Sequence, residues 1–152
     1  MDWIKWLTVT AILIRAVYTD KKDGKIENRI ILMGFVLGLF LAFADGGIQS
    51  LLESIKMAGI TLLALFFLFV MKGLGAGDIK LFCVLATFFP KQIIPIVILS
   101  FFAGAVFAVG KMFGRWLKKE KVFIRHETMN FSLPIALATE ILLFLRYLVT
   151  IQ

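Results

Sequence analysis

Cysteine and histidine are almost absent from this chain, since its 152 residues include one of each. A single cysteine excludes an internal disulfide framework, and Cys83 stands among apolar neighbours as a small hydrophobic side chain would. His126 lies in a basic segment with no second histidine or cysteine near it in the sequence, which argues against a zinc site built from soft ligands. We therefore expect no bound metal and no cofactor.

Charged residues are also scarce, at 18% of the chain, whereas 61% of the residues are hydrophobic and the mean hydropathy is +0.95. A soluble domain of this length could not bury so much apolar surface. In lipid, every backbone polar group must find a partner within the protein, which makes helices the default for each apolar segment. The composition predicts an all-α polytopic membrane protein, organised as one transmembrane domain over residues 1–152.

The apolar runs and their polar breaks predict about six transmembrane helices. They cover residues 3–18, 30–43, 57–71, 79–89, 93–112 and 131–149. The fourth is short, because its eleven residues rise only about 16 Å at 1.5 Å per residue, so it is either a half-span or lies where the membrane is thinned. Residues 48–56 have apolar side chains at helical spacing, which suits an interfacial helix before the third span or simply the outer end of that span.

Acidic residues are outnumbered by basic ones, ten against seventeen, and the basic residues are unevenly placed. Most of them fall in residues 19–29, near Lys72 and in residues 111–125, which an even number of spans places on one side. The positive-inside rule makes that side cytoplasmic and puts both termini outside. Topology and contact with anionic lipid then explain the net charge of +7, so no nucleic-acid partner is expected.

Three acids stand out by position, because Asp20 ends the first predicted span, Asp78 opens the fourth and Glu140 lies near the middle of the sixth. Asp20 and Asp78 should share one membrane level. Two carboxylates close together in a poorly solvated site cannot both ionise cheaply, so such a pair holds one proton near neutral pH. The ionised member can take a proton from water while the protonated member donates one, which is the chemistry of peptide hydrolysis without a metal.

The stretch 71–82, MKGLGAGDIKLF, places three glycines before Asp78. Gly73, Gly75 and Gly77 lack Cβ atoms, so the backbone can leave helical geometry and another helix or an extended substrate can approach closely. The simpler interpretation is that a Gly-rich turn precedes a helix and that the aspartate caps it.

Two motifs together resemble the type IV prepilin peptidases. Gly75-Ala76-Gly77-Asp78 with Lys80 is similar to the GxGDxK signature of that family of membrane aspartyl proteases. Asp20, followed by Ile26 and Asn28, resembles the family's first motif, an aspartate followed by I-P-N. Residues 131–138, FSLPIALA, resemble the Pro-containing last span.

The resemblance implies a membrane aspartyl endopeptidase that removes the basic leader from prepilins or pilin-like proteins at the cytoplasmic face of the inner membrane of a prokaryote. Asp20 and Asp78 would be the catalytic pair, while Gly75, Gly77, Asn28 and Lys80 would shape the motifs. Glu27 stands where the family usually has proline, which leaves the positioning of the first loop open. The paired CxxC motifs that accompany N-methylation in larger members are not found in this sequence, so we expect the short, peptidase-only type, like those of tight-adherence pili, without a methyltransferase domain.

Two further residues are interpreted as structural. Glu140 should face the bundle interior with a partner. It would either pair with Arg15, if the first and last helices are neighbours, or be a neutral, protonated carboxyl group hydrogen-bonded to the backbone. Lys80 should snorkel to the interface or form a local ion pair.

Other functions remain open from the sequence. A small ion-coupled transporter would use Asp20, Asp78 and Glu140 as ion ligands around an unwound segment. Presenilin-like proteases also use GxGD, but they place both aspartates inside longer spans. A non-catalytic pilus-assembly protein is a third alternative. The sequence does not indicate which pilin is cleaved or what oligomeric state the protein adopts.

Overall fold

The computed structural model describes residues 2–117 and 131–151, and the regular elements in these residues are all helices. The five helices in these residues are α1 (Asp2–Asp23), α2 (Asn28–Val70), α3 (Ala76–Phe88), α4 (Ile93–Leu117) and α5 (Ser132–Ile151). The predicted all-α class is confirmed. His126 and most of the second basic segment lie outside the described residues.

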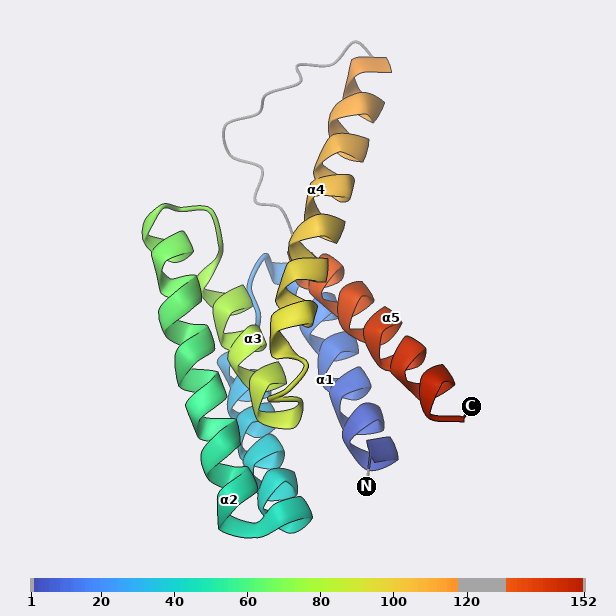
Figure 1. Cartoon of the computed structure of the whole chain (residues 1–152). Coiled ribbons are helices and arrows are strands. Elements are labelled where there is room, and N and C mark those ends of the chain that lie inside the picture. Colours follow the sequence, from blue (N-terminus) through green and yellow to red (C-terminus); the bar gives the residue numbers. More distant parts are fainter. Residues whose placement is uncertain (1, 118–130, 152) are drawn as a thin grey trace.

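The predicted second and third helices are the two arms of α2, and helical geometry is interrupted between them at Gly46 and Gly47. Gly46 and Gly47 have non-helical torsions, and the φ of +62° at Gly47 is one that residues with a side chain rarely adopt. The two arms run in opposite directions from this bend (Figure 1). Of the two alternatives predicted for residues 48–56, the outer end of the third span is the correct one, because these residues continue into the second arm without a further break and form no separate interfacial helix.

Three helices in the described part of the chain are long and apolar enough to cross a membrane: α2, residues Ile93–Gly114 of α4 and residues Ser132–Val149 of α5. The α1 helix contains Lys5, Arg15 and Asp20, and α3 has only 13 residues. The prediction that the fourth helix is short is correct. Its start was misplaced, because α3 begins at Ala76 rather than at residue 79 and so includes Asp78.

The short α3 helix lies at the centre of the molecule, between α2 on one side and α1 and α4 on the other (Figure 1). Its side chains from Leu81 to Phe88 are all buried. The same hydrophobic core includes Leu13 of α1, Ile96 of α4 and Ile135 of α5. Most large apolar side chains of the other helices face outward, as lipid contact requires.

Small residues bring the first arm of α2 close to α3. A Cβ atom on Gly34 would lie 2.9 Å from Val84, and one on Gly38 would lie 2.0 Å from the Thr87 hydroxyl. With the buried Ala42, these glycines form a stripe at four-residue spacing, the pattern by which membrane helices approach one another closely. α3 is thereby fixed against α2 along its length.

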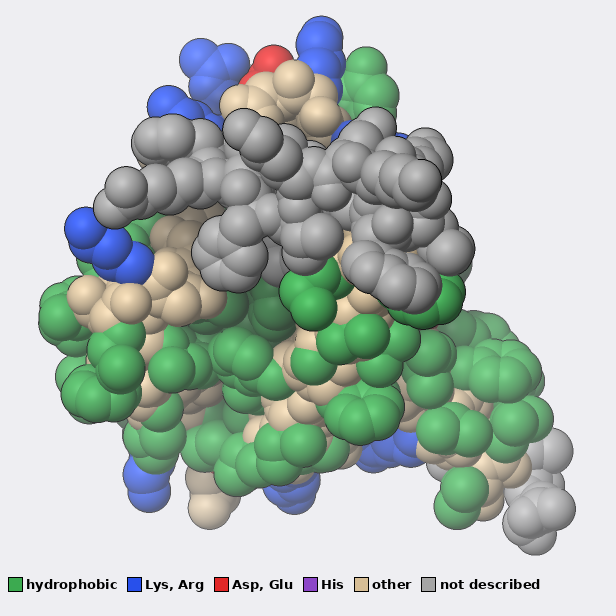
Figure 2. Space-filling model, turned by 90° about the horizontal axis from the view of Figure 1, so that it is seen from above, with side chains coloured by type: hydrophobic (Ala, Val, Ile, Leu, Met, Phe, Trp, Pro, Cys, Tyr) green, Lys and Arg blue, Asp and Glu red, His purple; other side chains and the backbone are tan. Residues whose placement is uncertain are grey.

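The chain ends and the bend of α2 lie at one end of the molecule, while the start of the α2–α3 loop and the end of α4 lie at the other (Figure 1). An ion pair between Lys5 and Asp45 ties the first turns of α1 to the bend. From the opposite end, Lys and Arg side chains are seen along the rim, with hydrophobic side chains around the flanks (Figure 2).

Candidate active site

A pocket of about 1270 Å³ opens at the end of the molecule away from the termini. It is lined by the loop after α1, the Gly-rich loop before α3, and parts of α4 and the residue preceding α5. Asp20 and Asp78 both line it, together with Gly75, Gly77, Asn28 and Lys80. All six residues that the sequence singled out as catalytic or motif-shaping therefore meet in one place.

Asp20 lies in the last turn of α1, which continues beyond the predicted end at residue 18. Gly24, at φ +64°, closes the helix, and its N–H donates to the Asp20 carbonyl at 2.9 Å. The Asp20 side chain is 8% exposed, whereas Asp23, one turn later, is exposed and does not line the pocket. The end of α1 thus directs one of these two acids inward.

Asp78 is the third residue of α3, and Gly75 is the residue that caps the helix. The Gly75 N–H donates to the Asp78 carboxylate, which is half of a capping box. The torsions at Gly75 are extended and open to any residue, so its lack of a side chain matters for space instead. A Cβ atom there would lie 2.8 Å from Asp78 Oδ2, while one on Gly77 would make ordinary 3.5 Å contacts with Ile26.

The loop before α3 begins with a Schellman motif at the end of α2. The Gly73 N–H donates to the Leu68 carbonyl and the Lys72 N–H to the Phe69 carbonyl, both at 2.9 Å. Lys72 itself takes the left-handed torsion, φ 58°, that glycine usually provides, at a cost of about 1 kcal/mol. Neither Gly73 nor Gly75 has a positive φ. The sequence correctly placed the break but not the residue that makes the turn.

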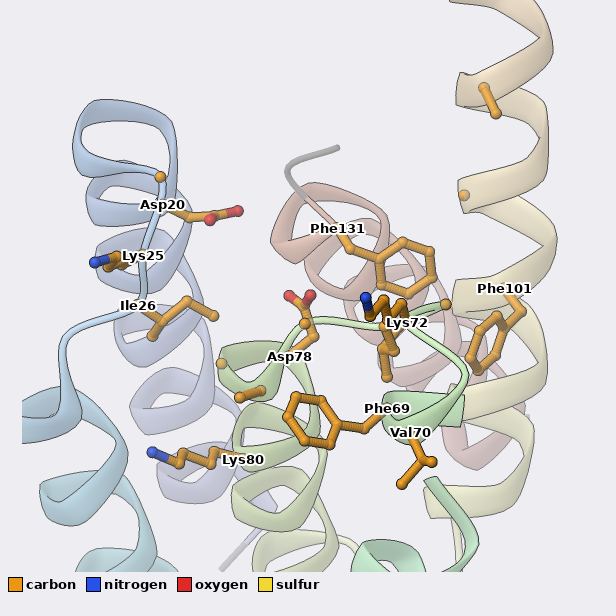
Figure 3. Close-up of a pocket in the computed structure, with 18 of the residues that line it drawn as sticks. Asp20, Lys25, Ile26, Phe69, Val70, Lys72, Asp78, Lys80, Phe101 and Phe131 are labelled. Carbon is orange, nitrogen blue, oxygen red and sulfur yellow. The ribbon is translucent and has the colours of Figure 1, made fainter. Parts of the chain in front are cut away.

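The two carboxyl groups project into the same space from α1 and α3 (Figure 3). Asp78 lies outside the three candidate spans, and its burial raises its pKa to about 7, with a second contribution from the negative charge of Asp20 and an opposing one from the Gly75 N–H. Asp78 can therefore hold a proton near neutral pH. A pair in which one acid is protonated and its neighbour accepts protons has the components of general acid and base catalysis.

Two contacts near the acids escaped the sequence interpretation. The hydroxyl of Ser132, the first residue of α5, donates to Asp20 Oδ2, and Ser132 is fully buried. Lys80 Nζ donates to Asn28 Oδ1 at 3.0 Å and so joins the start of α2 to α3, rather than pairing with an acid. A serine in an apolar segment 112 residues from its partner gives no local signal.

Glu27, where the resembled family usually has proline, occupies the N-cap of α2 with φ −61° and ψ 128°. Proline fixes φ near −65°, so the backbone here has the conformation that a proline would impose. Glu27 lacks the rigidity of a proline ring but has a φ that a proline could adopt.

Glu140 does not line the pocket and has neither of the partners considered for it. Its two carboxylate oxygens accept hydrogen bonds from the Trp6 indole at 2.8 Å and the Thr10 hydroxyl at 2.7 Å. α1 and α5 are neighbours, which a pair between Glu140 and Arg15 would require, but Arg15 lies over the Tyr18 ring instead. This cluster joins α1 to α5 away from the pocket.

Comparison with known proteins agrees with this arrangement. Over 117 residues the chain is 27% identical to "Prepilin peptidase EppA" of Methanocaldococcus jannaschii, an alignment that covers 70% of this chain and 33% of that protein. The chain thus matches about one third of the length of this relative. No solved structure matches it. The sequence profile of the type IV leader peptidase family matches residues 7–109, which include both the Asp20 and the Asp78 segments. This chain belongs to the type IV leader peptidase family.

Proposed function

We propose that the protein is a membrane aspartyl endopeptidase of the GxGD type, which removes the basic leader from prepilins or pilin-like proteins. The observation that carries this proposal is the meeting of two buried acids, Asp20 and Asp78, in one pocket. Family membership supports leader-peptide processing in general. The acid pair supplies a specific chemistry for it.

In the proposed mechanism, Asp78 enters the reaction protonated and Asp20 ionised. Asp20 removes a proton from water as the water oxygen attacks the scissile carbonyl, and Asp78 donates its proton to the carbonyl oxygen. The tetrahedral intermediate collapses when the leaving amine takes the proton held by Asp20 and a hydroxyl of the intermediate returns a proton to Asp78 as the C–N bond breaks. One peptide bond and one water are consumed, and the pair returns to its starting state, with Asp78 protonated and Asp20 ionised.

The proposed topology follows from the positions of the basic residues. The α1 helix, the two arms of α2, residues 79–89, α4 and α5 would cross the membrane as six segments. Lys25 and Lys72 line the pocket, so the positive-inside rule supports a cytoplasmic location for the acids and an outside location for both termini. A prepilin joins a basic leader to an apolar helix, and its scissile bond would meet the acids at that interface.

The distribution of acids favours a protease over an ion-coupled transporter. Transport would require acids along the path through the bundle. Glu140 is instead held by Trp6 and Thr10, while Asp20 and Asp78 gather at one end.

Single substitutions test the assignment of the pair. Asp20→Asn and Asp78→Asn should each accumulate in the membrane at normal levels and abolish leader removal from a co-expressed prepilin, because each lacks one proton-transfer group. Cleavage is measured by the change in prepilin mobility on gels and by mass spectrometry of the product.

Asp23→Asn is the matched control, since Asp23 belongs to the same helix end but is exposed and outside the pocket. It should cleave at nearly the normal rate. Normal processing by Asp20→Asn or Asp78→Asn would defeat the assignment of the pair.

A further inference from the structure

We propose that Ser132 is a positioning residue for Asp20, which holds one carboxylate oxygen so that this acid acts as the base of the pair. This inference rests on the proposed peptidase function and adds a residue outside both sequence motifs. Ser132 also lies beyond residues 7–109, over which the family profile matches.

The geometry of the contact carries the proposal. Ser132 Oγ donates to Asp20 Oδ2 across 112 residues of sequence, and the Ser132 side chain is fully buried. Most other buried hydroxyls have a different role, since those of Ser100 and Thr139 donate to backbone carbonyls of their own helices at 2.7 Å and 2.8 Å. The Ser132 hydroxyl instead donates its hydrogen bond to an acid of the pocket.

Ser132 is held firmly enough to orient a carboxylate. It is the first residue of α5, and the preceding Phe131 packs on Phe101 with ring centroids 5.3 Å apart and closely against Gly104. The position at the start of a helix also favours negative charge nearby. Both the hydroxyl and the helix end therefore stabilise an ionised carboxylate more than a neutral one.

Several other charged or titratable groups line the same pocket as Asp20. Asp78 of α3 projects into the same space, while Lys25 from the loop after α1, Lys72 from the loop before α3 and Lys80 of α3 line the pocket. The contact on which this proposal rests is the direct hydrogen bond from Ser132 Oγ to an Asp20 carboxylate oxygen.

The test compares Ser132→Ala with Ser100→Ala, which deletes an equally buried hydroxyl that does not contact an acid. Prepilin cleavage by each purified variant is measured from pH 4 to pH 9. Ser132→Ala should lower kcat about tenfold or more, as expected for loss of a hydrogen bond to a charged group. KM should change little, because a fully buried side chain cannot touch the peptide. The acid side of the rate profile should move to higher pH, and Ser100→Ala should change none of these quantities.

A second pair of variants covers a failure of Ser132→Ala to fold. Ser132→Thr keeps the hydroxyl and Ser132→Val replaces it with a methyl group in the same shape, so the ratio of their rates isolates the donor. Equal rates and identical pH profiles in the two would overturn the proposal. So would a fall in kcat for Ser132→Ala without a shift of the profile, since that is the result of a purely structural role.

A readout without substrate separates this inference from the proposed function. The loss of thermal stability in detergent caused by Ser132→Ala should be larger at pH 7 than at pH 4, because the hydroxyl bonds the ionised carboxylate more strongly. An equal loss at both pH values would count against the inference. Absence of prepilin cleavage by the wild-type protein would instead refute the peptidase assignment, whatever the stability data show.

Discussion

The protonation of a single side chain sets the pH dependence expected of this protein. Burial, with the neighbouring Asp20 charge, raises the pKa of Asp78 to about 7. Cleavage should therefore decline as the pH rises above about 7, because Asp78 loses the proton that it must donate. The initial rate of prepilin cleavage between pH 5 and pH 9 measures this, and a rate that stays constant to pH 9 would contradict it.

The same raised pKa makes a prediction about stability. A carboxyl group whose pKa is about 7 in the folded protein and 3.8 when unfolded stabilises the fold at low pH, and this stabilisation is lost as the pH rises between the two values. Asp78→Asn removes the ionisation. The melting temperature of the variant relative to wild type, measured in detergent, should therefore be higher at pH 8 than at pH 4. Asp23→Asn, with its exposed carboxyl group, should show no such difference.

The two glycines of the GxGD sequence should not be equivalent. An added Cβ at Gly75 would meet Asp78 Oδ2 at 2.8 Å and displace the carboxylate, whereas one at Gly77 would make ordinary contacts with Ile26. Gly75→Ala should thus reduce kcat far more than Gly77→Ala, with both proteins folded. Cleavage rates and melting temperatures of the two variants measure the difference. A larger loss of activity in Gly77→Ala would contradict the geometry.

At the scale of side chains, the sequence predicted the acids better than their partners. Asp20 and Asp78 could be found because each ends or begins an apolar run beside a recognisable motif. Ser132, Trp6 and Thr10 could not, because their hydrogen bonds to acids join the two ends of the chain. Such contacts depend on helix packing, and periodicity carries no information on which helices become neighbours.

At the scale of helices, hydrophobic runs predicted positions well and boundaries poorly. The α1 helix continues through Asp20 to Asp23, and α4 runs to Leu117 rather than to residue 112, because polar residues continue a helix once it has left the apolar region. The predicted separation of the second and third helices is correct, since Gly46 and Gly47 have non-helical torsions between the two arms of α2. The arms lie closer together in sequence than predicted, because residues 44–56 are helical on either side of these two glycines.

The packing of α2 on α3 should depend on the absence of one side chain. Gly38→Ala would place a Cβ atom 2.0 Å from the Thr87 hydroxyl and force the helices apart, at a cost of about 1–3 kcal/mol. Gly59→Ala is the matched control in the same helix, because nothing lies within 4 Å of its added Cβ. The control should be neutral or stabilising by about 0.5–1 kcal/mol. Thermal unfolding in detergent measures both, and equal melting temperatures would show that α3 does not pack here.

For the whole molecule, the proposed topology predicts which positions are accessible from outside the cell. Gln49, exposed just after the bend of α2, and Lys22, exposed at the end of α1, lie at opposite ends of the protein. A membrane-impermeant maleimide should label Gln49→Cys in intact cells and label Lys22→Cys only after permeabilisation. The wild type is the control, because its Cys83 is buried. The reverse pattern would place the pocket on the outer face.

The arrangement of the helices around the pocket gives the site a further property. α1, α3, α4 and α5 share one hydrophobic core, and a pocket of about 1270 Å³ is lined by both Asp20 and Asp78. In the proposed peptidase, a peptide entering this volume would displace water from the Asp78 carboxyl group, and dehydration penalises its charged form. Occupancy of the pocket and retention of the Asp78 proton would therefore reinforce each other, so above neutral pH the arrival of an uncharged peptide segment would draw a proton from solvent.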